Sequence, residues 1–156
     1  MKSVLAVPAL LAAKNIVSAA TIYWDGSGTG WDAVASWSTD SSATTPDPAA
    51  VPGSGDVATF NISSVNTNQT INFNANQAAT GLAFVSTGTV ALQGGGTNRT
   101  LTLGTSGLSI SSDAGAVSIG SGTSGQNVAI SLAGAQTWTN NGSGADSIPI
   151  LAKRPF

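Results

Sequence analysis

Short apolar–polar–apolar segments recur along the chain between residues 71 and 130, separated by clusters of Gly, Asn, Ser and Thr. The two apolar residues of each segment are two positions apart, which places both side chains on one face of a β-strand. The seven pairs are Ile71/Phe73, Leu82/Phe84, Val90/Leu92, Leu101/Leu103, Leu108/Ile110, Val117/Ile119 and Val128/Ile130. We therefore predict an all-β chain of short strands, each with one buried face.

The spacing of these pairs predicts how the strands stack. Every second pair forms one series and the interleaved pairs form another, and both series repeat with a period of about 19 residues. The pairs of the first series begin at positions 71, 90, 108 and 128, and those of the second at 82, 101 and 117, followed by the single Trp138. This period favours a parallel β-solenoid with two main strands in each coil of about 19 residues. An antiparallel meander or sandwich is the alternative, since it also has strands at this spacing.

A Trp-rich and turn-rich segment, residues 21–60, precedes these repeats. Trp24, Trp31 and Trp37 lie close together within it. An uncovered terminal coil would expose both its apolar interior and a free strand edge. We therefore predict that residues 21–60 form an N-terminal cap, with the aromatic rings packed over the first coil.

Residues 1–20 differ from the rest of the chain. A short basic start is followed by an apolar run at residues 3–13 and by small residues at 17–20. This order is typical of a signal peptide, here cleaved after Ala19 or Ala20. An N-terminal helix that stays on the protein is the alternative. The apolar run is too short to span a bilayer, so we expect an exported protein with no transmembrane segment in the mature chain.

The repeat pattern extends over residues 61–144. Residues 145–156 lack the pattern and place Lys153 beside Arg154. We interpret residues 145–156 as a non-repeat tail that is foreign to the repeat, which a truncated or frame-shifted reading frame would explain. An ordinary disordered terminus is the alternative.

Composition excludes several functions. The chain has five Lys and Arg, seven acidic residues that are all Asp, no His and no Cys. Because a nucleic-acid interface needs clustered Lys and Arg, we expect no nucleic-acid partner. Because the usual general base, the usual activator of a Ser nucleophile and the thiolate metal ligands are missing, we expect no enzyme activity, no catalytic residue, no metal site and no cofactor.

Two patterns near the N-terminus nevertheless resemble known chemistry. The segment Asp25–Gly30 has oxygen-bearing side chains at alternate positions, as a calcium loop does, but the twelfth position of the loop is Ser36 instead of Glu. We interpret the segment as a Gly-rich turn. Asp25 and Asp32 are the carboxylate pair that glycoside cleavage would require, and the alternative for both is a solvated surface charge.

Two further groups remain as candidates. Arg99 and Asp113 would suit a lyase, but their separation along the chain does not match the period, so we expect solvated charges. Trp24, Trp31 and Trp37 are candidate residues for stacking on a glycan, with the packed cap as the alternative use.

Residues 23–32, Tyr-Trp-Asp-Gly-Ser-Gly-Thr-Gly-Trp-Asp, are followed by Ser36-Trp37. Together they resemble the opening signature of proteins that carry autotransporter-associated β-strand repeats. Later blocks of this family, in the same order, resemble residues 51–60, 81–84 and 132–138. The resemblance covers most of residues 22–144.

This resemblance implies a right-handed parallel β-helix in a bacterial exported protein, where such repeats form passenger or cell-surface regions. It also implies no shared catalytic residues. We therefore expect a non-catalytic surface or adhesion-type structural segment, whose partner is a cell-surface glycan or protein. The alternative is a carbohydrate-binding or polysaccharide-cleaving β-helix protein.

Overall fold

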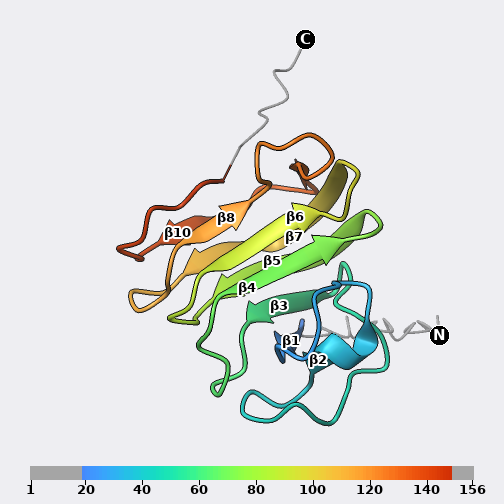
Figure 1. Ribbon diagram of the computed structural model, residues 1–156, viewed down its shortest axis with the longest axis vertical. Helices are drawn as coiled ribbons and strands as arrows, with labels where there is room; N and C mark the ends of the chain where they lie inside the picture. Colours follow the sequence, from blue (N-terminus) through green and yellow to red (C-terminus); the bar gives the residue numbers. More distant parts are fainter. Residues whose placement is uncertain (1–18, 149–156) are drawn as a thin grey trace, which may run out of the picture.

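The computed structural model describes residues 19–148, and within them it consists of β-strands and one short 3-10 helix (Figure 1). The all-β prediction is therefore confirmed. In chain order the elements are β1 (Ala20–Trp24), η1 (Val34–Ser36), β2 (Trp37–Ser38), β3 (Asp56–Phe60), β4 (Gln69–Phe73), β5 (Gln77–Phe84), β6 (Val90–Gly94), β7 (Arg99–Ile110), β8 (Val117–Ile119), β9 (Val128–Leu132) and β10 (Trp138–Asn140).

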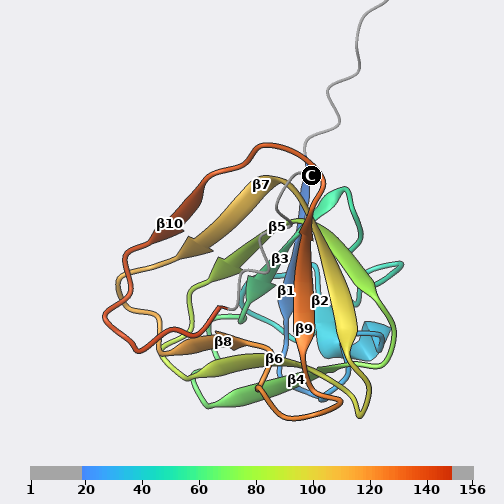
Figure 2. The ribbon, with the colours of Figure 1, turned by 90° about the horizontal axis from the view of Figure 1, so that it is seen from above.

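The strands form two sheets. One has the order β10-β7-β5-β3-β1-β2, with β9 also paired to β7, and the other has the order β4-β6-β8. All neighbours run parallel except β1 and β2. Seen from above (Figure 2), β4, β6 and β8 lie along one side of the molecule, and β3, β5, β7 and β10 lie along another. The antiparallel meander is therefore excluded as the main arrangement.

The strand register shows which segments lie side by side. Val90 pairs with Val117, Leu82 pairs with Leu108, and Leu108 pairs with Trp138. Each of these steps along the chain is longer than the predicted coil. The predicted repeat, with two strands in about 19 residues, is therefore wrong, because Val90 does not lie beside Leu108. The connections between paired strands vary in length. The regular spacing of the apolar pairs along the chain therefore does not show which pairs lie side by side.

The inward-facing residues of paired strands line up in rows across the sheets, and there are three such rows. The third row explains why the predicted two-strand repeat is wrong. Leu101 and Leu103 of β7 pair with Gln77 and Ala79 of β5, and Leu101 also pairs with Ile130 of β9. Ala79 is fully buried, but Gln followed by Ala is no strand signal in a sequence. A count of large apolar pairs therefore misses this member of the row, and three rows appear as two.

Strands β5 and β7 each contribute to two of these rows. The register between them shifts between Ala79 and Gly81. On β7 the irregularity contains Gly107, whose φ is +73°, and a Cβ at this position would clash with the carbonyl oxygen of Thr137. Only glycine fits this close approach to the segment that leads into β10.

The core lies between the two sheets. Every residue of the seven predicted apolar pairs is buried and belongs to one continuous cluster. Burial alternates along the strands, as in β6 and β8, where inward residues are buried and the residues between them are partly exposed. The inward face assigned to each pair from its period of two is therefore confirmed.

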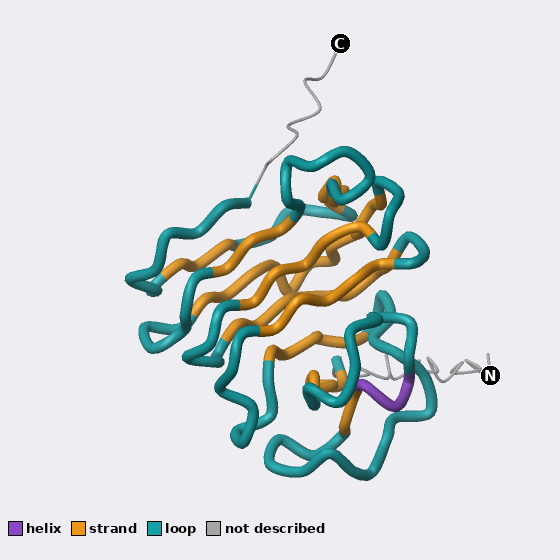
Figure 3. The backbone as a smooth tube through the Cα atoms, viewed as in Figure 1, coloured by secondary structure: helices purple, strands orange, loops and turns teal. Residues whose placement is uncertain are grey.

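The two ends of the stacked sheets differ, and the tube in Figure 3 shows the 3-10 helix together with long loops at the N-terminal end. There β1 pairs with β3 and β2, and Gly30 pairs with Asn72 of β4, so the Trp-rich segment lies across the first strands of both sheets. At the other end Ser147 pairs with Ser118, so the pairing extends beyond the predicted boundary at residue 144. The expected signal peptide, except for Ala19 and Ala20, and residues 149–156 lie outside the described residues.

Candidate functional site

The three N-terminal tryptophans form one buried aromatic cluster. Trp37 contacts Trp24 and Trp31 edge to face, with ring centroids 5.1 and 4.8 Å apart. Trp31 also contacts Phe73 at 5.0 Å. All three indoles are fully buried. None of them presents a ring face to solvent, so the glycan-stacking role considered for them has no exposed surface through which to act.

Hydrogen bonds fix two of these rings in place. The Trp37 Nε1–H donates to the carbonyl oxygen of Trp31 at 2.8 Å, and the Trp24 Nε1–H donates to the side-chain oxygen of Gln69 at 3.2 Å. The second bond ties the Trp cluster to the first strand of the β4-β6-β8 sheet. The cluster therefore serves packing at the N-terminal end, where aromatic rings bury a large apolar area.

The Gly-rich segment that loosely matches a calcium loop is a tight turn. The Asp25 carboxylate is buried, and its Oδ1 accepts the backbone N–H of Ser27 at 2.8 Å and the Ser27 hydroxyl at 2.7 Å. Asp32 is exposed, and its Oδ1 accepts a hydrogen bond from the side-chain amide of Gln77. The two carboxylates are thus engaged by different partners, each of them a neutral polar group.

Arg99 and Asp113 bond to different partners. The Arg99 Nε–H donates to the carbonyl oxygen of Phe73 at 3.2 Å, at the start of β7. Asp113 is exposed beyond the end of β7, and its Oδ1 accepts the Ser112 hydroxyl at 3.4 Å. Among residues 19–148 no three acidic side chains come close enough together to hold a metal ion. No helix in this part of the chain is long and apolar enough to cross a membrane.

Local hydrogen bonds also hold the side chain of Asp40. The hydroxyl and the backbone N–H of Ser42 both donate to Asp40 Oδ1, at 2.7 and 2.8 Å. These bonds favour the charged form and lower the pKa of the partly exposed Asp40 carboxyl, the hydroxyl having the larger effect. The arrangement is that of a surface turn in which an Asp side chain accepts from the backbone two positions later.

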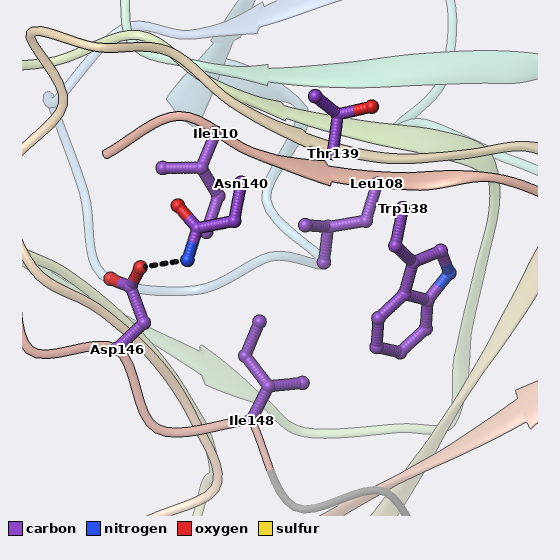
Figure 4. A pocket seen from close by; sticks show the side chains of 7 residues that line it. All are labelled: Leu108, Ile110, Trp138, Thr139, Asn140, Asp146 and Ile148. Atoms are coloured by element: carbon purple, nitrogen blue, oxygen red, sulfur yellow. Dashed lines mark hydrogen bonds between the residues drawn. The ribbon is translucent and has the colours of Figure 1, made fainter. Parts of the chain in front are cut away.

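An apolar hollow of about 290 Å³ lies at the C-terminal end of the stacked sheets (Figure 4). Its lining residues come from β7, β10 and the segment 146–148, and they are Leu108, Ile110, Trp138, Thr139, Asn140, Asp146 and Ile148. In Figure 4 the apolar side chains of Leu108, Trp138 and Ile148 converge on this space.

Asp146 is the only charged group among the residues that line this hollow, and its two oxygens are occupied. Oδ2 accepts the side-chain N–H of Asn140 at 2.7 Å, and Oδ1 accepts the backbone N–H of Val117 at 2.8 Å. The carboxylate therefore connects β8 with the end of β10 and leaves the hollow itself apolar. Sequence reasoning missed Asp146 because the residue falls beyond the repeat pattern.

A second, shallower hollow of about 400 Å³ is lined by Leu132, Trp138 and the segment 134–136 between them. Leu132 is 53% exposed, the largest exposed fraction of any large apolar residue in the described part of the chain. We call β9, β10 and residues 146–148 together the C-terminal end surface. It combines two apolar hollows with the outermost strands of the larger sheet.

The chain was also compared with known proteins. No family model, no curated protein and no solved structure matches it. The resemblance to the autotransporter-associated repeats therefore rests on the residues quoted for it.

Proposed function

We propose that residues 20–148 form the coils of a right-handed β-solenoid, and that the protein is a non-catalytic, exported surface or adhesion-type structural segment. The observation that carries this proposal is the continuous parallel pairing from β3 through β5 and β7 to β10, and from β4 through β6 to β8. Crossover connections between parallel strands of one sheet are right-handed in nearly all proteins, which supports the hand of the solenoid.

The three rows of inward positions supply the interior of such coils. One row contains Ile71, Leu92 and Ile119, and a second contains Leu82, Leu108 and Trp138. The third is the row of Leu101 and Leu103. Each coil then contacts only its neighbours and adds about 4.8 Å of length. A protein built in this way gains reach with every coil, which suits a stalk or a passenger region.

Polar side chains on the outside connect neighbouring coils. The Gln93 side-chain amide donates to Asn72 Oδ1 at 3.0 Å, and the backbone N–H of Thr100 donates to Asn76 Oδ1 at 3.0 Å. These bonds join segments 21 and 24 residues apart. None of the bonded groups titrates near neutral pH, so the bonds persist over a wide pH range, as an extracellular segment requires.

The alternative function, binding or cleavage of carbohydrate, needs acidic, basic or aromatic groups gathered on one outward face. In the described residues Asp32 is bonded to Gln77, whereas Arg99 and Asp113 bond separate partners. The structural role is therefore the function that the geometry supports best.

Export of the full chain in a bacterium tests the proposal. We expect the protein outside the cytoplasm, with a new N-terminus at Ala20 or Thr21 by mass spectrometry. The matched control is Leu10→Lys, which interrupts the apolar run and should leave the chain uncut inside the cell. An uncut wild-type chain in the cytoplasm would refute the export step, and cleavage of a polysaccharide by the purified protein would favour the alternative function.

A further inference from the structure

We propose that residues 41–47 are a site of O-linked glycosylation, at which the hydroxyls of Ser41, Thr44 and Thr45 accept a sugar. The segment lies in the connection between β2 and β3, at the N-terminal end of the molecule (Figure 1). The biological setting of this inference rests on the proposed role as an exported surface segment, whereas its chemistry depends only on this loop.

Residues 41–47 form the longest run of exposed positions within residues 19–148. Elsewhere exposed and buried positions alternate, as they do throughout residues 84–90. None of the residues in the exposed run belongs to the hydrophobic core. An enzyme that modifies a side chain must enclose the segment around it, so an exposed loop suits this purpose better than a paired strand.

The exposed run is fixed at both of its ends. The backbone N–H of Ser63 donates to the carbonyl oxygen of Ser41 at 2.8 Å. At the other end the carbonyl oxygen of Pro46 accepts the backbone N–H of Thr39 at 3.0 Å, and Pro48 is buried. A bulky sugar on a side chain between these contacts therefore requires no rearrangement of the core.

The hydroxyls of the run differ in their hydrogen bonds. The Ser42 hydroxyl donates to Asp40 Oδ1 at 2.7 Å, which holds it in a surface turn. Within residues 19–148 no group hydrogen-bonds to the hydroxyls of Ser41, Thr44 or Thr45, and all three residues are exposed. Such a hydroxyl oxygen is available as a nucleophile once a base takes its proton.

The sequence around these hydroxyls is typical of O-glycosylated segments. Residues 41–50 are Ser-Ser-Ala-Thr-Thr-Pro-Asp-Pro-Ala-Ala. The small side chains of Ala leave the hydroxyls uncovered, and Pro46 cannot donate to a strand ladder. Segments rich in Ser, Thr and Pro are characteristic acceptors of O-linked sugars. Exposure, free hydroxyls and composition therefore coincide in this one loop.

The transfer requires a sugar that is activated as a diphosphate ester at its anomeric carbon, together with a glycosyltransferase. The acceptor hydroxyl oxygen forms a bond to the anomeric carbon, and the bond from this carbon to the phosphate oxygen breaks. The diphosphate leaves with the bonding electron pair, and the hydroxyl proton passes to a base of the transferase. The acceptor hydroxyl is the only group that this chain needs to contribute.

Incubation of the purified full chain with a bacterial O-oligosaccharyltransferase and an oligosaccharide on polyprenyl diphosphate tests this inference. We expect the intact mass to rise by one or more oligosaccharides, which fragmentation by electron transfer should place on Ser41, Thr44 or Thr45. The triple variant Ser41→Ala/Thr44→Val/Thr45→Val should lose this mass gain. The matched control Thr87→Val/Thr89→Val removes two exposed hydroxyls between β5 and β6 and should be modified as the wild type is.

Circular dichroism before the reaction would show that the three proteins are folded. A wild-type chain that gains no mass, sugars that map to Asn side chains or to hydroxyls within the strands, or a mass gain that the triple variant retains would each overturn the inference. The reaction uses purified protein and does not require export. Failure of glycosylation is therefore distinguishable from failure of the export that the proposed function predicts.

Discussion

At the scale of single residues, the Trp cluster shows what a sequence can and cannot predict. The proximity of Trp24, Trp31 and Trp37 along the chain indicated an aromatic group, and it left open packing and glycan stacking. Whether the tryptophans pack or stack on a glycan depends on Phe60 and Phe73, which come from later strands and contact the Trp31 ring. No local pattern indicates that these rings would meet.

A truncation within the cluster measures its contribution to stability. Trp31→Ala should lower the free energy of unfolding by about 3–5 kcal/mol, because it removes a fully buried ring and leaves a cavity. Chemical denaturation followed by tryptophan fluorescence and circular dichroism would give this value. Val85→Ala is the control, and it should change stability by less than about 0.5 kcal/mol. A loss below about 1 kcal/mol for Trp31→Ala would contradict the packing role.

The glycine at the irregularity of β7 allows a more selective test. Gly107 and Gly122 both have positive φ, +73° and +71°, but a Cβ would clash with Thr137 only at Gly107, since nothing lies within 4 Å of a Cβ at Gly122. In both Ala variants a non-glycine residue must adopt a positive φ, which lowers stability by about 1 kcal/mol. Gly107→Ala should therefore destabilise the protein clearly more than Gly122→Ala in thermal melts. Equal losses would show that the segment before β10 does not approach β7 this closely.

At the scale of elements, the sequence predicted most of the strands but not their neighbours. The apolar pairs identified the strands because burial with a period of two is a local property. Pairing is not local, since it depends on loop lengths and on inconspicuous residues such as Gln77 and Ala79. The predicted repeat consequently placed Val90 beside Leu108, whereas the structure places it beside Val117.

Cross-linking distinguishes these two registers. The chain has no Cys, so introduced thiols react only with each other. Ala91 pairs with Ser118, and neighbouring strands lie close enough for a disulfide between Cα atoms about 5 Å apart. The double variant Ala91→Cys/Ser118→Cys should therefore form a disulfide on oxidation, seen as a mobility shift and a mass loss. The control pair Ala91→Cys/Ser109→Cys matches the register of the predicted repeat and should stay reduced; the reverse result would refute the observed pairing.

At the scale of the whole molecule, residues 19–148 form a linear array of strands whose N-terminal end is covered by the Trp-rich segment. The composition indicated a chain without long helices and with a polar exterior, because Gly, Ser, Thr and Asn favour turns and exposed strands over helices. The Trp-rich segment was predicted at one end of the array. The state of the other end could not be predicted, because residues 145–148 carry no repeat pattern yet Ser147 pairs with Ser118.

Amide hydrogen exchange would show how this asymmetry affects stability. In a linear array a strand is held by its neighbours, and β3 has a neighbour on each side, whereas β9 and β10 pair only with β7 among the described strands. We therefore expect the amides of β9 and β10 to exchange faster than those of β3 in dilute protein, because strands with few contacts open locally first. Equal exchange rates in β3, β9 and β10 would instead indicate a single cooperative unit.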